Sequence, residues 1–219
     1  MGVSYIAISD NFNVQSGFAF PSIAFENAGI PIVRMSDLKN GKLRFENTKY
    51  VSHNWLTTAA AFELRENDFL MGMSGSLSNY AVVSLDDLPS LLNQRVCRLQ
   101  SQNNKQSYEY VCYWLKSDFY HGYAEIQGEG AAQKNISSKQ IGRFKYRAAT
   151  LGEQQKISHI LKTIDRAIEH TEALIDKYQQ IKAGLMHDLF TRGIGPDGQL
   201  RPPRDQAPDL YQQTPSGWI

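Results

Sequence analysis

Residues 153–190, EQQKISHILKTIDRAIEHTEALIDKYQQIKAGLMHDLF, decide the architecture of this chain. Apolar residues recur along the stretch in steps that alternate between three and four, which is typical of a helix that lies along another helix. At about 1.5 Å per residue this helix would be ~55 Å long, more than one compact domain needs to cover its core. The seam positions are Ile157, Leu161, Ile164, Ile168, Ile175, Tyr178, Leu185 and Leu189, with Thr171 and Lys182 in the two gaps.

A second set of apolar residues widens this seam beyond that of a two-helix zipper. The wide stripe predicts several contacts: a partner helix, and either the chain's own globular part or a further protein. A single amphipathic helix folded back on its own globular part is the alternative. If two copies pair antiparallel with two-fold symmetry, the midpoint falls near Thr171 to Ile175 and brings Leu174 close to its own copy. The additional apolar residues are Ile160, Ala167, Leu174 and Ile181.

Capping signals mark both ends of the helix. Thr150 and Glu153 form a T-x-x-E capping box, in which each side chain satisfies a free backbone N–H of the other residue. Arg192 in the last turn, Gly193 as the C′ residue and Pro196 just beyond predict the end. The expected parts are a globular domain over 1–149, a long helix over 150–192 and a linker rich in Pro, Gly, Asp and Gln over 193–219.

The first part of the chain reads as a mixed α/β body. Short β-rich runs alternate with clusters of Gly, Asn, Asp and Ser, and at least one helix is expected over 107–123. The strands do not alternate regularly with helices, so the pattern favours an α+β fold over a doubly wound parallel sheet. The expected strands lie at 30–36, 67–73, 80–85 and 95–99, and the expected helix buries Tyr110, Val111, Trp114, Leu115 and Phe119 on one face.

Composition bounds the class of protein. The formal net charge of the 219 residues is +1, so the chain as a whole carries no basic signal for nucleic acid. Cys97 and Cys112 show neither metal-ligand spacing nor a disulfide-rich context, which indicates a reducing, cytoplasmic setting with both thiols in the core. We recognise no signal peptide, and no apolar run approaches the roughly 18 residues of a membrane span.

No catalytic site, metal site or cofactor site can be assembled from the sequence. The five histidines are scattered, and no metal-binding or phosphate-binding motif occurs. GEGAAQ at 128–133 begins like a dinucleotide loop, but Gln133 stands where the third glycine belongs. Asp37 and Lys39 offer half of a metal-dependent nuclease motif without a clear acidic partner upstream.

Polar and basic residues favour DNA binding. The segment 132–147 carries five Lys and Arg residues and no acidic residue, and amides and hydroxyls are interleaved with them. Basic groups neutralise phosphates, while Gln and Asn read adenine edges and Arg reads guanine. Similar residues occur at 34–44, 73–80 and 94–95. A solvated charged face with ordinary turns is the alternative. The candidate DNA contacts are Arg34, Lys39, Asn40, Lys42, Ser74, Ser76, Asn79, Gln94, Arg95, Gln133, Lys134, Asn135, Lys139 and Arg143.

Several short motifs occur along the chain in an order that is typical of one protein family. It resembles one half of the specificity subunit of type I restriction–modification enzymes. The resemblance lies in SGFAFPSIAFENAGIPIVRMSDLKNGK, LLNQRVCRL, GEGAAQKNIS, EQQKISHILKTIDRAIEHTEALI and GLMHDLFTRGI, the last continuing into GQLRP, APDLY and SGWI.

This resemblance implies a target-recognition domain that reads one half of a bipartite double-stranded DNA sequence, followed by a spacer helix that docks methyltransferase subunits. Methylation and cleavage would be performed by the methyltransferase subunits and a restriction and translocase subunit of the same complex, in the prokaryotic cytoplasm. The complete subunit of the family has two such domains and two antiparallel helices, so one domain with one helix predicts a homodimer. The alternatives from other classes are a stand-alone Mg²⁺-dependent endonuclease that uses Asp37 and Lys39, and a coiled-coil adaptor without DNA affinity.

Overall fold

The structure, a computed structural model, describes residues 4–128, 134–214 and 217–218. It divides into two compact units, Met1–His159 and Ile160–Ile219. Gln133 and most of the GEGAAQ stretch lie outside the described residues, so the expectation for Gln133 rests on the sequence alone.

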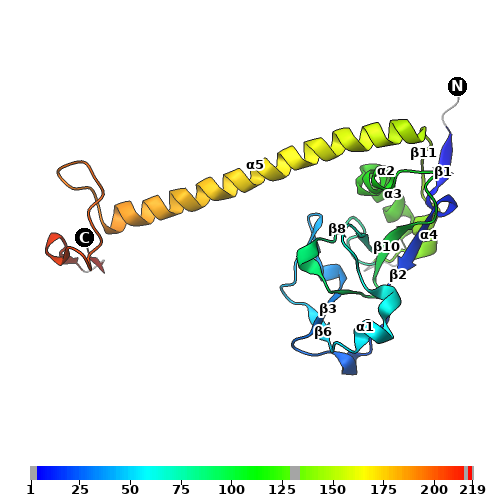
Figure 1. Cartoon of the computed structure of the whole chain (residues 1–219), viewed down its shortest axis with the longest axis horizontal. Helices are drawn as coiled ribbons and strands as arrows, with labels where there is room; N and C mark the ends of the chain where they lie inside the picture. The colour runs from blue at the N-terminus through cyan, green and yellow to red at the C-terminus, as the bar shows by residue number, and fades with distance from the viewer. Residues whose placement is uncertain (1–3, 129–133, 215–216, 219) are drawn as a thin grey trace. The chain divides into compact units, whose positions relative to one another are not determined.

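A four-stranded antiparallel sheet forms the centre of the first unit, with the strand order β2-β10-β7-β8 (Figure 1). Its strands are β2 (Phe12–Ser16), β7 (Phe69–Gly72), β8 (Tyr80–Val82) and β10 (Val96–Ser101). A second sheet has the order β6-β3-β9, in which β3 pairs antiparallel with β6 and parallel with β9. Its strands are β3 (Ile30–Val33), β6 (Lys49–Val51) and β9 (Leu91–Leu92). The mixture of short sheets and helices confirms the α+β class.

Both faces of the central sheet are covered, which explains why its strands read as continuous apolar runs. Phe69 and Met71 belong to a core cluster with residues of helices α2 (Tyr108–Lys116) and α3 (Asp118–Gln127). Leu70, between them, belongs to a different cluster with residues of β3 and the hairpin that follows it. Successive side chains of a strand point to opposite faces, so one apolar run serves two cores.

The helical stretch expected over 107–123 forms two helices, because the structure breaks it at Ser117. Ser117 has an extended backbone (φ −80°, ψ 157°) and serves both as the C-cap of α2 and as the N-cap of α3. Its hydroxyl donates to the Trp114 carbonyl at 2.6 Å, and Asp118 follows in the first turn of α3, where a carboxylate suits the helix dipole. The break also changes the fate of Phe119, which is 74% exposed instead of sharing the buried face.

The remaining short elements of the first unit close its edges. β1 (Tyr5–Ala7) pairs antiparallel with β11 (Lys145–Arg147), and β4 (Leu38–Lys39) forms a hairpin with β5 (Lys42–Leu43). The short helices are α1 (Trp55–Thr58) and α4 (Ser138–Gly142), and the 3-10 turns are η1 (Ile8–Asp10), η2 (Ser22–Ala24), η3 (Met35–Asp37), η4 (Ala60–Phe62) and η5 (Leu85–Asp87). Cys97 and Cys112 are free and buried, as the sequence predicted.

The long helix α5 runs from Leu151 to Thr191 as one continuous element. The capping box before it is confirmed, because the Glu153 carboxylate accepts from the Thr150 N–H at 2.9 Å and the Thr150 hydroxyl accepts from the Glu153 N–H at 3.3 Å. Gly193 follows the helix with a φ of +70°, the left-handed conformation that a C′ glycine adopts freely. Among the residues that the structure describes, no helix combines the length and apolar character needed to cross a bilayer.

The residues after α5 carry short elements that the sequence did not indicate. Ile194 and Leu200 form an antiparallel bridge, and η6 (Pro208–Leu210) precedes a hairpin of β12 (Gln213–Thr214) and β13 (Gly217–Trp218). Tyr211 is 7% exposed, and its hydroxyl donates to the Pro202 carbonyl at 2.5 Å. The second unit thus contains local order beyond the end of the helix.

Candidate nucleic-acid interface

Three of the polar segments meet at one end of the central sheet. Segment 73–75 continues β7 and lies between the turn at 93–95 and segment 134–136. The Met73 N–H donates to the Arg95 carbonyl at 3.0 Å. On the other side, Gly75 donates to the Lys134 carbonyl at 2.8 Å, and Ile136 donates to the Met73 carbonyl at 2.9 Å. We call residues 73–79, 93–95 and 134–135 the loop cluster.

The β4–β5 hairpin lies against β8, the edge strand of the central sheet. Asn40 and Gly41 form its turn with positive φ values of 51° and 78°, as a tight hairpin requires. The Gly41 carbonyl accepts from the Val82 N–H at 2.9 Å, which ties the turn to β8. Lys39, Asn40 and Lys42 are exposed there. The fold therefore brings the hairpin within 34–44 against β8, the strand that follows segment 73–79.

Two of the predicted phosphate contacts are paired with carboxylates in this structure. Lys39 Nζ lies 2.7 Å from Glu46 Oε2, and this contact lowers the pKa of the Glu46 carboxyl. Lys134 Nζ lies 2.5 Å from Glu125 Oε2 and also donates to the Glu125 carbonyl at 2.8 Å. Any DNA phosphate that contacts either ammonium has to compete with its carboxylate.

Other candidates differ in accessibility. Arg34 is half-buried, and its Nη2 donates to the Asn47 carbonyl at 2.6 Å. Ser74 is 4% exposed, whereas Ser76 and Gln94 are exposed and Asn79 is half-buried. The Ser76 hydroxyl lies 3.0 Å from that of Ser78. The loop cluster thus presents hydroxyls and amides beside guanidinium and ammonium groups.

Lys139 and Arg143 do not belong to the loop cluster. Lys139 lies in α4 and Arg143 is its C-cap, and α4 packs against β2 at the opposite edge of the sheet from β8. Both residues are exposed. The Tyr123 hydroxyl donates to the Gln140 carbonyl at 2.7 Å and holds α4 in place. The stretch 132–147 that looked continuous in sequence is therefore divided in space.

Asp37 has a structural role that the nuclease alternative does not explain. Asp37 is 1% exposed, and its carboxylate accepts from the Arg34 N–H at 2.8 Å and from the Ser36 and Thr48 hydroxyls at 3.2 and 3.1 Å. The ammonium of Lys39 is engaged with Glu46 instead. Within the described ranges, no group of three or more His, Cys, Asp and Glu side chains is arranged to hold a metal ion.

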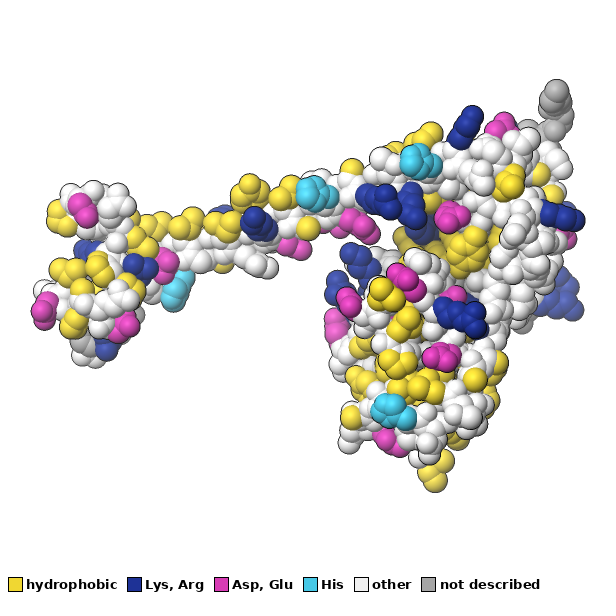
Figure 2. All heavy atoms as spheres, in the orientation of Figure 1, with side chains coloured by type: hydrophobic (Ala, Val, Ile, Leu, Met, Phe, Trp, Pro, Cys, Tyr) yellow, Lys and Arg dark blue, Asp and Glu magenta, His cyan; other side chains and the backbone are white. Residues whose placement is uncertain are grey.

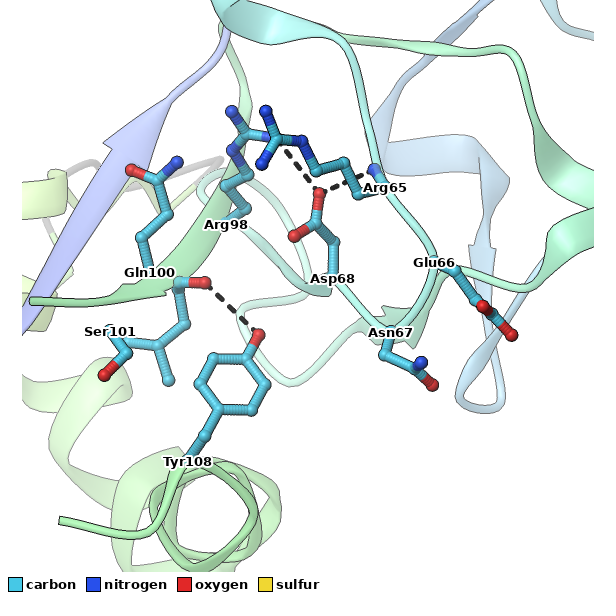
Figure 3. A pocket seen from close by; sticks show the side chains of 9 residues that line it. Arg65, Glu66, Asn67, Asp68, Arg98, Gln100, Ser101 and Tyr108 are labelled. Carbon is cyan, nitrogen blue, oxygen red and sulfur yellow. Dashed lines mark hydrogen bonds and ion pairs between the residues drawn. The ribbon is translucent and has the colours of Figure 1, made fainter. Parts of the chain in front are cut away.

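A polar pocket lies at the other end of the central sheet from the loop cluster (Figure 3). It contains Arg98, a buried arginine that the sequence analysis did not single out. Its guanidinium donates to Asp68, to the Gln15 side chain and to the carbonyls of Ala61 and Glu63, at 2.7 to 3.0 Å. A charged residue inside the apolar run RVCRL was the signal for such a network. The other lining residues are Arg65, Glu66, Asn67, Leu99, Gln100, Ser101 and Tyr108.

The apolar seam of α5 is exposed along the helix (Figure 2). Exposures run from 39% at Leu174 to 66% at Tyr178. The Thr171 hydroxyl donates to the Ala167 carbonyl at 2.8 Å, so this seam position satisfies its own polar group within the helix. The seam residues with large exposed apolar side chains are Ile157, Ile164, Ile168, Ile175, Tyr178, Leu185 and Leu189, and Leu174 of the additional set is exposed as well. Of the other seam positions, Leu161 is half-buried and Lys182 is exposed.

A small α+β body with polar loops at one sheet end, continued by a long helix with an exposed apolar seam, defines a recognition module joined to a helical connector. The family model described as the type I restriction modification DNA specificity domain matches residues 2–180. The chain belongs to this family.

The chain is also similar to two specificity subunits from Escherichia coli. The specificity subunit of the type I restriction enzyme EcoAI is 25% identical over 197 residues, which cover 88% of this chain and 33% of that subunit. The EcoBI specificity subunit is 27% identical over 184 residues, which cover 80% of this chain and 35% of that subunit. The chain spans about a third of the length of these relatives.

A solved structure shows the same fold. The S subunit of a type I restriction–modification system from M. genitalium superposes with a TM-score of 0.60 at 17% identity, over 87% of this chain and 46% of that one.

Proposed function

We propose that this chain supplies DNA sequence specificity to a type I restriction–modification system by reading one half of a bipartite target. The observation that carries the proposal is the family match over residues 2–180, which includes the whole loop cluster and most of α5. The loop cluster supports it, because amides, hydroxyls and basic groups occur together where a duplex would have to be both positioned and read.

We assign different roles to the three parts of the chain. Residues 1–149 would be the target-recognition domain, and residues 150–192 the spacer and dimerisation helix. Residues 193–219 would be a linker. In this proposal the loop cluster and the β4–β5 hairpin contact base edges and phosphates, and Lys139 and Arg143 contact phosphates from a separate surface.

The chain would be non-catalytic and would act with partner subunits in the cytoplasm of a prokaryotic cell. Modification methyltransferase subunits would dock on it, and a restriction and translocase subunit would join through them. The position of Asp37 supports this assignment over the stand-alone endonuclease, because its buried carboxylate already accepts hydrogen bonds from the Arg34 N–H and from the Ser36 and Thr48 hydroxyls.

The exposed seam of α5 supports a homodimer of antiparallel helices. Burying a Leu or Ile side chain stabilises an interface by about 1.5–3 kcal/mol, and the seam repeats such residues over its whole length. The two-fold axis would pass near residue 173, so that Leu174 faces the partner's copy of itself.

The test is a binding selection on a pool of randomised duplex DNA, performed with the full chain alone and with its methyltransferase subunits. Enrichment of a fixed base pattern supports sequence recognition, and two inverted copies separated by unspecified bases support the symmetric dimer. Binding without any enriched pattern, or no binding in either assembly, contradicts the proposal. Incubation with supercoiled plasmid and Mg²⁺ distinguishes the endonuclease, which would cut the DNA without any partner.

A further inference from the structure

The loop cluster holds an exposed arginine and an exposed asparagine side by side. Arg95 Nη1 donates to Asn135 Oδ1 at 3.4 Å, although the residues are 40 positions apart in sequence. Both residues are exposed. We propose that Arg95 reads a guanine base and that Asn135 is the positioning residue that aims its guanidinium. This inference rests on the proposed DNA-recognition function.

The backbones that carry the two side chains are fixed by the same strand. Segment 73–75 bonds to Arg95 on one side through Met73 N–H, and an antiparallel bridge joins Ser74 to Asn135 on the other. The neighbouring residue, Ile136, is 2% exposed and belongs to the main core cluster. Arg95 is anchored further by its own N–H, which donates to the Asn93 side chain at 3.3 Å. Strand-like pairing and core packing therefore fix the positions of the two backbones from which these side chains extend.

Arg95 differs from the nearby lysines in the kind of side chain that it contacts. Lys39 and Lys134 contact carboxylates, which offset their charge, whereas the Asn135 oxygen that Arg95 contacts is neutral. An amide oxygen accepts one N–H and restricts the side chain but leaves the positive charge in place. A guanidinium has five N–H donors in a planar fork, so the contact with Asn135 leaves donors for the O6 and N7 atoms of guanine.

This assignment changes the role of Asn135 from the one suggested by sequence. The sequence placed Asn135 among the amides that read bases directly. In the structure its carboxamide oxygen faces Arg95, so we assign it to orientation. Such ordering matters because an arginine that is already aimed loses less side-chain entropy when it binds.

The experiment is a selection on randomised duplex DNA with the full chain and three variants, followed by affinity measurements on the enriched duplex. We expect the wild-type pattern to contain a guanine whose preference over the other bases falls by about 5- to 150-fold in Arg95→Ala. Asn135→Ala should reduce the same preference by roughly 2- to 12-fold, the contribution of one hydrogen bond, and leave the salt dependence unchanged. Asn135→Asp should flatten the salt dependence as well, because a carboxylate offsets the guanidinium charge.

Arg65→Ala is the matched control, because it removes an exposed arginine at the opposite end of the same sheet. It should leave the base pattern intact, and thermal unfolding should show all four variants folded. A guanine preference that survives in Arg95→Ala overturns the inference and leaves the proposed function standing. A pattern without guanine also overturns the inference alone. A wild-type chain that enriches no pattern overturns both. An equal loss at every position in Asn135→Ala would show a merely structural role for Asn135.

Discussion

Arg98 Nη1 and Asp68 Oδ2 lie 3.0 Å apart, and their side chains are only 7% and 16% exposed. The contact joins β10 to the turn that leads into β7, because Asp68 also accepts from the Arg65 N–H at 2.9 Å. The same guanidinium satisfies the carbonyls of Ala61 and Glu63. Figure 3 shows the Asp68 carboxylate between the Arg98 guanidinium and the Arg65 backbone. The Arg98 side chain thus holds the segment that enters the central sheet at the end away from the loop cluster.

Replacing Arg98 should destabilise the first unit strongly. Arg98→Ala removes the guanidinium from the Asp68 carboxylate and from the carbonyls of Ala61 and Glu63. Breaking one partner of a buried ion pair costs about 3–5 kcal/mol. Denaturant unfolding followed by tryptophan fluorescence measures the free energy. Arg65→Ala, the exposed control, should change it by no more than roughly 0.5 kcal/mol. Equal stability of the two variants would show that the network contributes little.

Substitutions at the centre of α5 should weaken self-association. Leu174→Ala and Ile175→Ala together should cost several kcal/mol of dimerisation, at about 2–5 kcal/mol for each buried side chain that is truncated. Light scattering at micromolar concentration measures the change from dimer to monomer. Gln180→Ala, on the polar face of the same helix, is the control and should remain dimeric. A monomeric wild-type chain at this concentration contradicts the antiparallel pairing.

The salt dependence of DNA affinity should distinguish Lys139 from Lys134, which is paired with Glu125. Lys139→Ala should flatten the slope of log affinity against log salt by roughly one unit and leave base preference unchanged, if it contacts a phosphate. Glu125→Gln should have the opposite effect, because it frees the charge of Lys134 from its carboxylate partner. Fluorescence anisotropy on one duplex over a salt series gives both slopes. Unchanged slopes in both variants would place these residues away from the DNA.

The capping box of α5 should make a contribution that is lost in acid. Hydrogen bonds from the Thr150 side chain and backbone lower the pKa of the Glu153 carboxyl below its ordinary value. Because the folded pKa lies below the unfolded one, the contribution is complete above the unfolded pKa and disappears as pH falls through the folded pKa. The stability difference between wild type and Glu153→Gln should therefore shrink as pH is lowered from 7 to 3 in denaturant titrations.

Two further variants test the contribution of the capping box to stability. Thr150→Ala should cost about 0.5–2 kcal/mol at pH 7, the usual range for an N-cap. Glu169→Gln removes the same charge from the middle of α5 and serves as the control for Glu153→Gln. If both glutamine variants show the same dependence on pH, the capping geometry is not its source.

The two cysteines should be unreactive in the folded chain. Burial raises the pKa of Cys97 to about 12 and raises that of Cys112 as well, so both remain protonated near pH 8. Alkylation with iodoacetamide, followed by mass spectrometry, should label neither thiol until denaturant is added. Rapid labelling of the native protein would show that the core around α2 opens readily.

Local patterns predicted the elements that depend on near neighbours. The heptad spacing and the Thr150, Glu153 and Gly193 signals located α5 and its ends, because helix hydrogen bonds and caps join residues three to five positions apart. The β-rich runs located the strands β3, β7, β8 and β10. The burial of Cys97 and Cys112 followed from composition and context.

The tertiary structure decided where these elements meet. Arg95 and Asn135 come together through pairing on both sides of segment 73–75, and Arg98 meets Asp68 through the register of β10 on β7. Such contacts join residues 30 or 40 positions apart in the sequence. The periodicity of one strand does not indicate which other strand will pair with it. At Ser117 the sequence pattern was misleading. Apolar residues recur at helical spacing on both sides of Ser117, but α2 and α3 pack as separate helices. The physical reason is that periodicity specifies which face of an element is apolar, whereas the identity of the surface that covers the face is settled by the packing of the whole chain.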